Sequence, residues 1–294
     1  MKNYNERIYY IAFNCLINFT YQQYKLLLKS FGSLTKAFFS SYSDLLKSGL
    51  NSKTVFSFVE KRKNFDIERV LNQIEKEKIQ ICIFSDINYP KLLKNIYNPP
   101  PLFYYKGNLD INWDYSLSVV GSRKMTSYGE KIAFSLIPPL IQNNIAIISG
   151  LAIGIDSMAH RITIDNKGKT IAILGSGLDY YSIYPSFNKS LVDEIIKNDG
   201  LVISEFPLKT PAFPYNFPQR NRIIAGLSKA ILIIEASQKS GSLITAKHAL
   251  EEGREVLSVP ADIFNEAYNG NNYLIKKGAV VVNKIDDILD LWCK

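Results

Sequence analysis

The chain of 294 residues is 47% hydrophobic and 21% charged, a composition that excludes a largely disordered protein and leaves room for two domains. Its formal net charge of +8 favours an acidic partner such as nucleic acid. A general enrichment in Lys, Asn, Ile and Tyr would produce the same positive charge in a protein without such a partner. The net charge is therefore only weak support for nucleic-acid binding.

The cysteines and the apolar runs indicate a cytoplasmic protein. Cys15, Cys82 and Cys293 are scattered and lack metal-binding spacing, which indicates a reducing compartment and no disulfide framework. Residues 1–19 have a basic start, but two asparagines interrupt them and no small-residue cleavage site follows, so they predict a helix rather than a signal peptide. The apolar run 145–155 is too short to cross a bilayer, and we expect no membrane association.

Residues 1–75 predict a small helical domain. Apolar residues recur at helical spacing over 21–30, 34–39 and 52–59, and Gly and Ser turns separate these segments. Domains of this kind bind the DNA backbone through helix N-termini or serve only for packing and dimerisation, and the sequence leaves both alternatives open.

Residues 76–115 are predicted to be a connector that packs on the main domain. Residues 79–84 alternate weakly in the manner of a strand. Prolines at 99–101 keep the chain extended as it enters the apolar residues 102–105. We therefore place the domain boundary between residues 75 and 115.

From Ser116 onward, apolar runs with strand character alternate with helix-like segments. The predicted strands cover residues 117–121, 145–149, 170–174, 201–204, 230–235, 255–259 and 279–282. The predicted helices begin near residues 127, 155, 187, 222, 243 and 271, a last helix covers 285–292, and the prolines at 138–139 should end or kink the first of them. Such repeated units imply parallel strands with right-handed crossovers. We expect residues 116–294 to form an α/β domain with an extended Rossmann-like, doubly wound, mostly parallel sheet.

A ligand of such a sheet binds beyond the carboxyl ends of its strands. Glycine, serine and basic residues gather in the loops at these ends. Glycine lets a ligand approach the backbone closely, and N–H groups at a helix N-terminus hold phosphate. The candidate binding residues in these loops are Gly121, Ser122, Arg123, Gly150, Lys239, Ser240, Gly241 and Ser242.

Residues 216–222 are predicted to be a loop that leads into a short helix. An aromatic ring offers a face to a base, and arginine offers a fork to phosphate. Two arginines two positions apart share a side of an extended loop, whereas a helix that begins before them would leave at most one in the site. In the alternative interpretation the ring packs on the sheet and the arginines pair with Glu205 or Glu235. The candidate residues of this segment are Phe217, Arg220, Asn221 and Arg222.

No catalytic or cofactor-binding set is complete in the sequence. Gly175-Ser176-Gly177 begins a dinucleotide fingerprint without its third glycine, and there is no Walker sequence. Asp156 and His160 could seat a metal on one helix face, but no third ligand accompanies them. Glu235 could serve as an acid or base at a strand end, but no nucleophile stands with it. We predict that the protein is not an enzyme and uses no cofactor or metal.

Taken in order, the motifs resemble those of the DNA-processing protein A family (DprA, also called Smf) over about residues 79–289. They are Gly-Ser-Arg at 121–123, Ser-Tyr-Gly at 127–129, the run 149–156, Gly-Ser-Gly-Leu-Asp at 175–179, Ser-Glu-Phe-Pro at 204–207, and the runs 216–228, 240–246 and 272–275. The helical N-terminal domain is similar to the sterile-alpha-motif-like (SAM-like) domain common in that family.

The resemblance implies a protein that binds single-stranded DNA without sequence preference in a basic pocket lined by the candidate residues named above. It also implies a homodimer that loads the RecA recombinase onto strands coated by single-strand-binding protein, in natural transformation and homologous recombination. Residues 243–294 cover the usual region of both protein interfaces. Because the chain ends at Lys294, we expect no C-terminal winged-helix-like domain of the kind that some members carry.

The sequence is also compatible with two other functions. One is a Rossmann-like nucleotide hydrolase of the lysine-decarboxylase-like type, although the loop 240–246 lacks the glutamate of the Pro-Gly-Gly-x-Gly-Thr-x-x-Glu motif of those enzymes. The other is an interaction scaffold that does not bind DNA.

Overall fold

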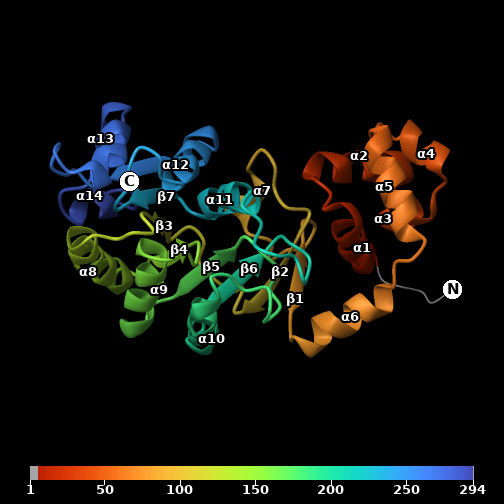
Figure 1. Cartoon of the computed structure of the whole chain (residues 1–294), viewed down its shortest axis with the longest axis horizontal. Helices are drawn as coiled ribbons and strands as arrows, with labels where there is room; N and C mark the ends of the chain where they lie inside the picture. Colours follow the sequence, from red (N-terminus) through yellow and green to blue (C-terminus); the bar gives the residue numbers. More distant parts are fainter. Residues whose placement is uncertain (1–5, 294) are drawn as a thin grey trace.

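A computed structural model describes residues 6–293, which form an elongated α/β body with a helical unit at one end (Figure 1). A side chain caps the start of five of the N-terminal helices by accepting a backbone N–H from three residues ahead; the capping residues are Thr20, Ser33, Ser41, Asn51 and Asp66. These caps explain why such short helices begin where they do, and the predicted helical region is confirmed. The helix predicted over residues 1–19 is observed as α1. Residues 1–5 of the predicted segment lie outside the described part of the chain. The helices are α1 (Arg7–Ile17), α2 (Tyr21–Phe31), α3 (Leu34–Phe39), α4 (Tyr42–Lys47), α5 (Ser52–Arg62) and α6 (Ile67–Lys76).

The body is built on a sheet with the strand order β1-β2-β6-β5-β4-β3-β7-β8-β9. All neighbours from β6 to β9 are parallel, whereas β2 is antiparallel to β1 and to β6. The predicted mostly parallel, doubly wound sheet is therefore confirmed, and the segments around residues 79–84 and 102–105 supply its antiparallel edge. The strands are β1 (Gln80–Ile83), β2 (Leu102–Gly107), β3 (Ser116–Val120), β4 (Ala146–Ser149), β5 (Thr170–Leu174), β6 (Leu201–Ser204), β7 (Ala230–Ile233), β8 (Glu255–Ser258) and β9 (Val280–Val281).

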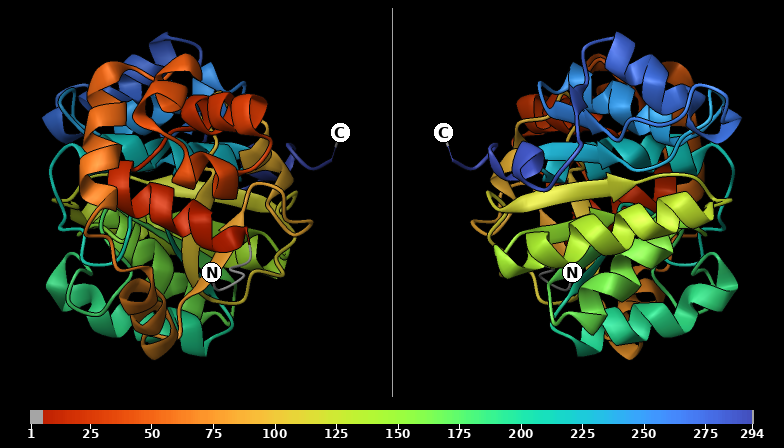
Figure 2. Two further views of the ribbon diagram at one scale, coloured as in Figure 1. Left: turned by 90° about the vertical axis from the view of Figure 1, so that its right-hand side faces the viewer. Right: turned by 90° about the vertical axis from the view of Figure 1, so that its left-hand side faces the viewer.

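Helices cover both faces of the sheet (Figures 1 and 2). In β5, Ile171 and Ile173 join the core under α11 and α12, while Ala172 and Leu174 join the core on the other face. Burial on both faces explains why the strands appear in the sequence as continuous apolar runs. One face carries α7 (Lys91–Lys94), α11 (Asn216–Leu227), α12 (Ser242–Glu251) and α13 (Asn269–Lys276); the other carries α8 (Ser127–Gln142), α9 (Ile155–Asp165), α10 (Lys189–Lys197) and α14 (Asp286–Leu289). No helix within residues 6–293 combines the length and the apolar character needed to cross a membrane.

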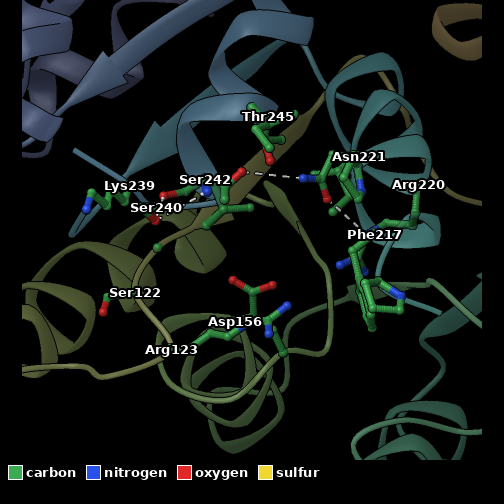
Figure 3. A pocket seen from close by; sticks show the side chains of 18 of the residues that line it. Ser122, Arg123, Asp156, Phe217, Arg220, Asn221, Lys239, Ser240, Ser242 and Thr245 are labelled. Carbon is green, nitrogen blue, oxygen red and sulfur yellow. Dashed lines mark hydrogen bonds between the residues drawn. The ribbon is translucent and has the colours of Figure 1, made fainter. Parts of the chain in front are cut away.

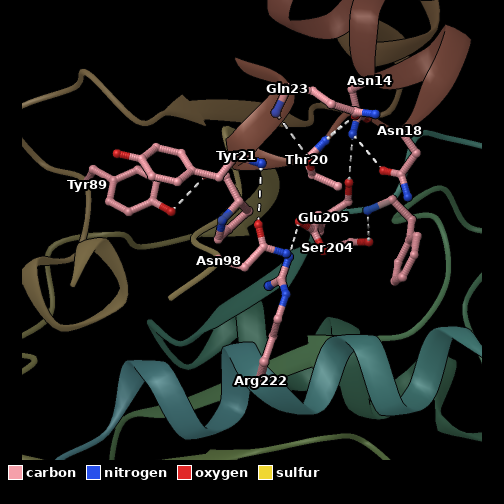
Figure 4. A network of polar contacts seen from close by, with 12 residues as sticks. Asn14, Asn18, Thr20, Tyr21, Gln23, Tyr89, Asn98, Ser204, Glu205 and Arg222 are labelled. Atoms are coloured by element: carbon pink, nitrogen blue, oxygen red, sulfur yellow. Dashed lines mark hydrogen bonds and ion pairs between the residues drawn. The ribbon is translucent and has the colours of Figure 1, made fainter. Parts of the chain in front are cut away.

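The N-terminal helices share a hydrophobic core with the sheet. Aromatic and aliphatic side chains of α1 to α5 belong to the same buried cluster as Leu102 and Val202 of the sheet. At their border the Tyr104 hydroxyl donates to Asn14 Oδ1 over 3.0 Å. Asn14 Nδ2 donates to the backbone oxygen of Glu205 over 3.2 Å (Figure 4). The helical unit and the sheet are therefore packed together through both apolar and polar contacts.

The course of α8 excludes one of the two outcomes predicted for its prolines, an end of the helix. The helix does not end at Pro138 and Pro139 but continues through them to Gln142. Each proline removes one intrahelical hydrogen bond. The buried side chains of Ile137 and Leu140 hold the last turn against the sheet and offset this loss.

Candidate nucleic-acid interface

The segment 216–222 forms the first turns of α11, so the prediction of a loop there is wrong. Pro218 is the third residue of the helix, where the backbone N–H has no intrahelical acceptor. The proline is therefore compatible with the helix start. As a result, Arg220 and Arg222 lie on different sides of α11 (Figures 3 and 4).

A pocket of about 660 Å³ lies at the carboxyl ends of β3 and β7 (Figure 3). The strand order reverses between these two strands, and such a reversal is the usual ligand site of a doubly wound sheet. The first turns of α9, α11 and α12 also contribute lining residues, so the positive ends of three helices surround the pocket. The pocket unites all the candidate residues except two, namely Gly121, Ser122, Arg123, Phe217, Arg220, Asn221, Lys239, Ser240, Gly241 and Ser242.

Exposed basic side chains stand around the opening of this pocket. Arg123, Lys124 and Lys239 are exposed, and none of them forms an ion pair with another residue of the described chain. Their charges are therefore available to an anionic ligand.

Phe217 presents an aromatic ring beside these charges. The ring is half-buried, and the Arg123 guanidinium lies 5.4 Å from its centroid. A Cβ atom on Gly175 would come within 3.0 Å of the ring, so glycine at that position makes room for it. The Tyr184 ring lies 5.9 Å away and also lines the pocket. An aromatic face beside a guanidinium suits a base that is followed by a phosphate.

Arg220 forms part of the pocket floor and is only 4% exposed. Its Nη1 donates to the backbone oxygen of Gly150 over 2.6 Å and also to that of Ile173, and its Nε donates to Asn221 Oδ1 over 3.2 Å. Burial lowers the pKa of Arg220 to about 10, although the Asp156 carboxylate opposes this shift. Gly150 does not line the pocket; its oxygen anchors Arg220, and a Cβ there would come within 2.6 Å of Nη1.

Asp156 is the acidic residue of the pocket lining. Its carboxylate accepts the backbone N–H of Gly150 over 3.1 Å. Burial raises the pKa of Asp156, while the charge of Arg220 and backbone N–H groups oppose that shift. The His160 ring is engaged elsewhere, because its Nδ1 lies 2.6 Å from the Thr170 hydroxyl of β5. Within residues 6–293 no group of three or more His, Cys, Asp or Glu side chains could hold a metal ion.

Arg222 lies outside the pocket and pairs with Glu205 (Figure 4). Both side chains are mostly buried, at 14% and 11% exposure. For Arg222 the alternative interpretation, pairing with a carboxylate, is confirmed. Glu235 is also buried, and it forms no ion pair with an arginine of residues 6–293. It accepts hydrogen bonds from Thr126, which caps the start of α8, and from Tyr268, and it is not part of the pocket lining.

Comparison with known proteins identifies the family. The family model described as DNA recombination-mediator protein A matches residues 80–292. The chain belongs to this family. It is 38% identical over 271 residues to the DNA processing protein DprA of Streptococcus pneumoniae, an alignment that covers 83% of this chain and 95% of that protein. It is 42% identical over 224 residues to the protein Smf of Escherichia coli, covering 76% of this chain and 59% of that protein.

Solved DprA structures confirm the fold. The crystal structure of DprA from Streptococcus pneumoniae matches with a TM-score of 0.82 and 36% identity, over 99% of this chain and 98% of that one. DprA from Helicobacter pylori, whose structure was described for its single-stranded DNA binding mode, matches with a TM-score of 0.63 and 28% identity, over 73% of this chain and 96% of that one. The resemblance of the sequence motifs to the DprA family is therefore confirmed.

The sequence alone did not select every residue of the DprA pocket. Lys124 follows Arg123 directly and could have been found from that neighbourhood. Thr245 lies one turn beyond Ser242 on α12, and the helical period places both on one side. Tyr184 follows the third predicted strand at the ligand edge, but it was not chosen as a candidate residue. Pro214 comes from a loop whose course depends on tertiary packing, and no local signal marked it.

Proposed function

We propose that this DprA-family protein binds single-stranded DNA without sequence preference. The observation that carries the proposal is the open pocket in which the unpaired Arg123 lies over the half-buried Phe217. Phosphates bind to Arg123, Lys124 and Lys239 and to the helix N-termini. A base stacks on Phe217, and stacking works with any base because every base has a π face.

The shape of the ligand follows from the same contacts. A duplex hides its base faces inside the stack, whereas an unpaired strand exposes them. The single-stranded DNA binding mode described for Helicobacter pylori DprA supports this choice of ligand. The closed set of internal contacts around Arg220 supports a preformed pocket that needs little ordering on binding.

We further propose the role of a recombination mediator in the cytoplasm. In this role a homodimer places two pockets on one strand, which raises avidity, and loads RecA recombinase onto strands covered by single-strand-binding protein during natural transformation or homologous recombination. The proposal includes no catalytic step, cofactor or metal ion.

The DNA-binding proposal is tested by titrating single-stranded and duplex oligonucleotides at two salt concentrations and following fluorescence anisotropy. Wild-type protein should prefer the single strand. Phe217→Ala should weaken single-strand binding by about 1–3 kcal/mol for every base composition, since one stacking contact is lost.

Phe134→Ala serves as the control, because Phe134 is exposed on α8 outside the pocket. Equal affinity for duplex and single strand, or an unchanged affinity of Phe217→Ala, would contradict the proposal. Release of free base from nucleoside monophosphates would instead support the nucleotide-hydrolase alternative.

The mediator role needs a separate measurement. RecA filament growth on oligonucleotides coated with single-strand-binding protein should begin sooner when this protein is present. No acceleration would contradict RecA loading while leaving DNA binding intact.

A further inference from the structure

A second hollow, of about 490 Å³, lies where the N-terminal helical unit meets the sheet. The end of α1, one side of α5 from Lys53 to Lys61, and the segment 206–219 form its walls, and we name it the seam groove. None of its lining residues in the described chain is Asp or Glu, whereas Lys53 and Lys61 both line it. The remaining lining is rich in amide and hydroxyl side chains such as Asn18, Thr54 and Gln219. This chemistry fits a polyanion with hydrogen-bonding bases.

The seam groove and the Arg123 pocket share a wall. Ala212, Pro214 and Phe217 line the pocket, while Phe213 and Tyr215, which alternate with them along the chain, line the seam groove. One segment of chain therefore separates the two hollows, and a flexible strand that leaves one reaches the other by crossing this segment.

The crossing point carries a pair of exposed aromatic rings. Phe213 and Tyr215 are 41% and 61% exposed. Their rings are stacked, with centroids 5.3 Å apart and planes 11° from parallel. An exposed pair of stacked rings is the kind of platform on which unpaired bases lie.

The two lysines are placed to hold phosphates. Lys61 Nζ donates to the backbone oxygen of Leu16 over 3.0 Å, which fixes the ammonium group at the end of α1 and leaves two of its N–H groups for another acceptor. Lys53 is exposed in the first turn of α5, whose positive end adds to its charge. Neither lysine forms an ion pair with a residue in the described part of the chain.

We propose that single-stranded DNA leaving the Arg123 pocket crosses the stacked rings of Phe213 and Tyr215 and continues along the seam groove. The N-terminal helical unit is then a part of the DNA path and not only a packing module. This inference rests on the proposed function, because it extends the strand that occupies the pocket. It gives the protein two subsites for one ligand, an inner one at Phe217 and an outer one at the groove.

The test is a ladder of oligothymidylates of increasing length, titrated against wild-type protein and two double variants. Lys53→Gln/Lys61→Gln and Phe213→Ala/Tyr215→Ala both alter the groove. Wild-type affinity should keep rising with length after the affinity of the groove variants has levelled off. On the longest oligonucleotide the ring variant should bind roughly tenfold more weakly, and the lysine variant should lose about 0.7 of salt slope for each lost phosphate contact.

The matched control is Lys29→Gln/Lys36→Gln. It removes the same charge from exposed positions of the same helical unit that do not line the groove, and it should follow the wild-type ladder. Groove variants that match wild type at every length would overturn the proposal. A loss that is equal for the shortest and longest oligonucleotides would also overturn it, since the groove would then act only through the inner pocket.

A cross-linking experiment tests the outer subsite at the seam groove separately from the proposed DNA binding in the Arg123 pocket. An oligothymidylate with a single 5-iodouracil is irradiated on the protein, and the modified peptides are identified by mass spectrometry. Outer positions should attach to Phe213 or Tyr215 and inner positions to Phe217. Attachment at Phe217 alone overturns the outer subsite but not the proposed function, whereas wild-type protein that binds no oligonucleotide of any length overturns both.

Discussion

At the scale of single residues, three arginines have three different tasks. Arg123 is exposed over an aromatic ring, Arg220 is buried among backbone oxygens, and Arg222 is paired with Glu205. Exposure and pairing therefore separate the residue that we propose to bind phosphate from two whose contacts lie within the protein. We therefore expect substitution of Arg123 to change the affinity for DNA, and substitution of Arg222 to change the stability of the fold.

Arg123→Ala should weaken binding to single strands of every sequence alike. It removes a phosphate contact, so the slope of log affinity against log salt should become flatter by about 0.7. Thermal unfolding should barely change, because the side chain is exposed. Anisotropy titrations across a salt series measure the slope. Arg161→Ala, at an exposed position of α9 outside the pocket, should leave it unchanged.

Arg222→Ala should destabilise the protein and leave its affinity for DNA unaltered. The Glu205 carboxylate would remain mostly buried without its partner, a loss of about 3–5 kcal/mol in the free energy of unfolding. Urea denaturation measures the loss, and titration well below the midpoint measures the affinity. A double-mutant cycle with Glu205→Gln should show coupling between the two positions; additive effects would count against the ion pair.

At the scale of elements, a hydrogen bond between His160 of α9 and Thr170 joins α9 to β5. The geometry of this contact defines which ring nitrogen of His160 carries the proton. The Thr170 hydroxyl donates to the backbone oxygen of Ile147 over 2.9 Å, so it can only accept from His160 Nδ1. The proton of the neutral ring is therefore on Nδ1. Nε2 is buried without a hydrogen-bond partner in the described chain, and burial lowers the pKa of His160 to about 3.

This histidine should make the fold sensitive to acid. The unfolded chain, with a histidine pKa near 6.5, binds the proton that the folded chain excludes, so His160 contributes full stability above about pH 6.5. That contribution falls as the pH drops toward 3, by at most about 1.4 kcal/mol per pH unit. The raised pKa of Asp156 acts in the opposite direction, since protonation then favours the folded state as the pH falls.

Urea denaturation of wild-type protein and His160→Gln between pH 4 and 7 separates these effects. The difference between the two proteins should shrink or reverse as the pH falls, because glutamine does not titrate. His248→Gln is the control: His248 is half-buried beside Glu251 and lacks the buried environment of His160. Parallel curves for wild type and His160→Gln would contradict the assignment.

The sequence predicted those elements whose signal is local. Strands such as β5 were found because burial on both faces makes them continuously apolar. The start of α11 was missed because Pro218 resembles a helix breaker unless its place in the first turn is known. The partner of Arg222 was found only as one of two carboxylates, since pairing between positions far apart depends on how the helices cover the sheet. The sequence also left open which of Arg220 and Arg222 lines the pocket. That depends on the residue at which α11 begins, because the start of the helix fixes the side on which each residue lies.

At the scale of the whole molecule, the helical unit and the sheet share one hydrophobic cluster. A shared core couples the unfolding of the parts that contribute to it. Both tryptophans, Trp113 and Trp292, lie in the sheet-bearing part, so their fluorescence reports on that part alone.

Thermal unfolding followed by tryptophan fluorescence and by far-ultraviolet circular dichroism should therefore give one common midpoint. Asn14→Ala, which removes the hydrogen bonds to Tyr104 and Glu205, should lower that midpoint for both probes although Asn14 belongs to α1. Two separate transitions, or a fluorescence midpoint unaffected by the substitution, would show that the parts unfold independently.

Glu205 is held from two sides: its backbone oxygen by Asn14 of α1, and its carboxylate by Arg222 of α11. Exchange of N-terminal modules between relatives, whether in evolution or in the laboratory, must respect this anchorage. A chimera joined near residue 76 keeps the anchor only if the incoming first helix brings an amide donor to the place of Asn14. Modules that lack one would be expected to graft poorly even where their apolar surfaces match.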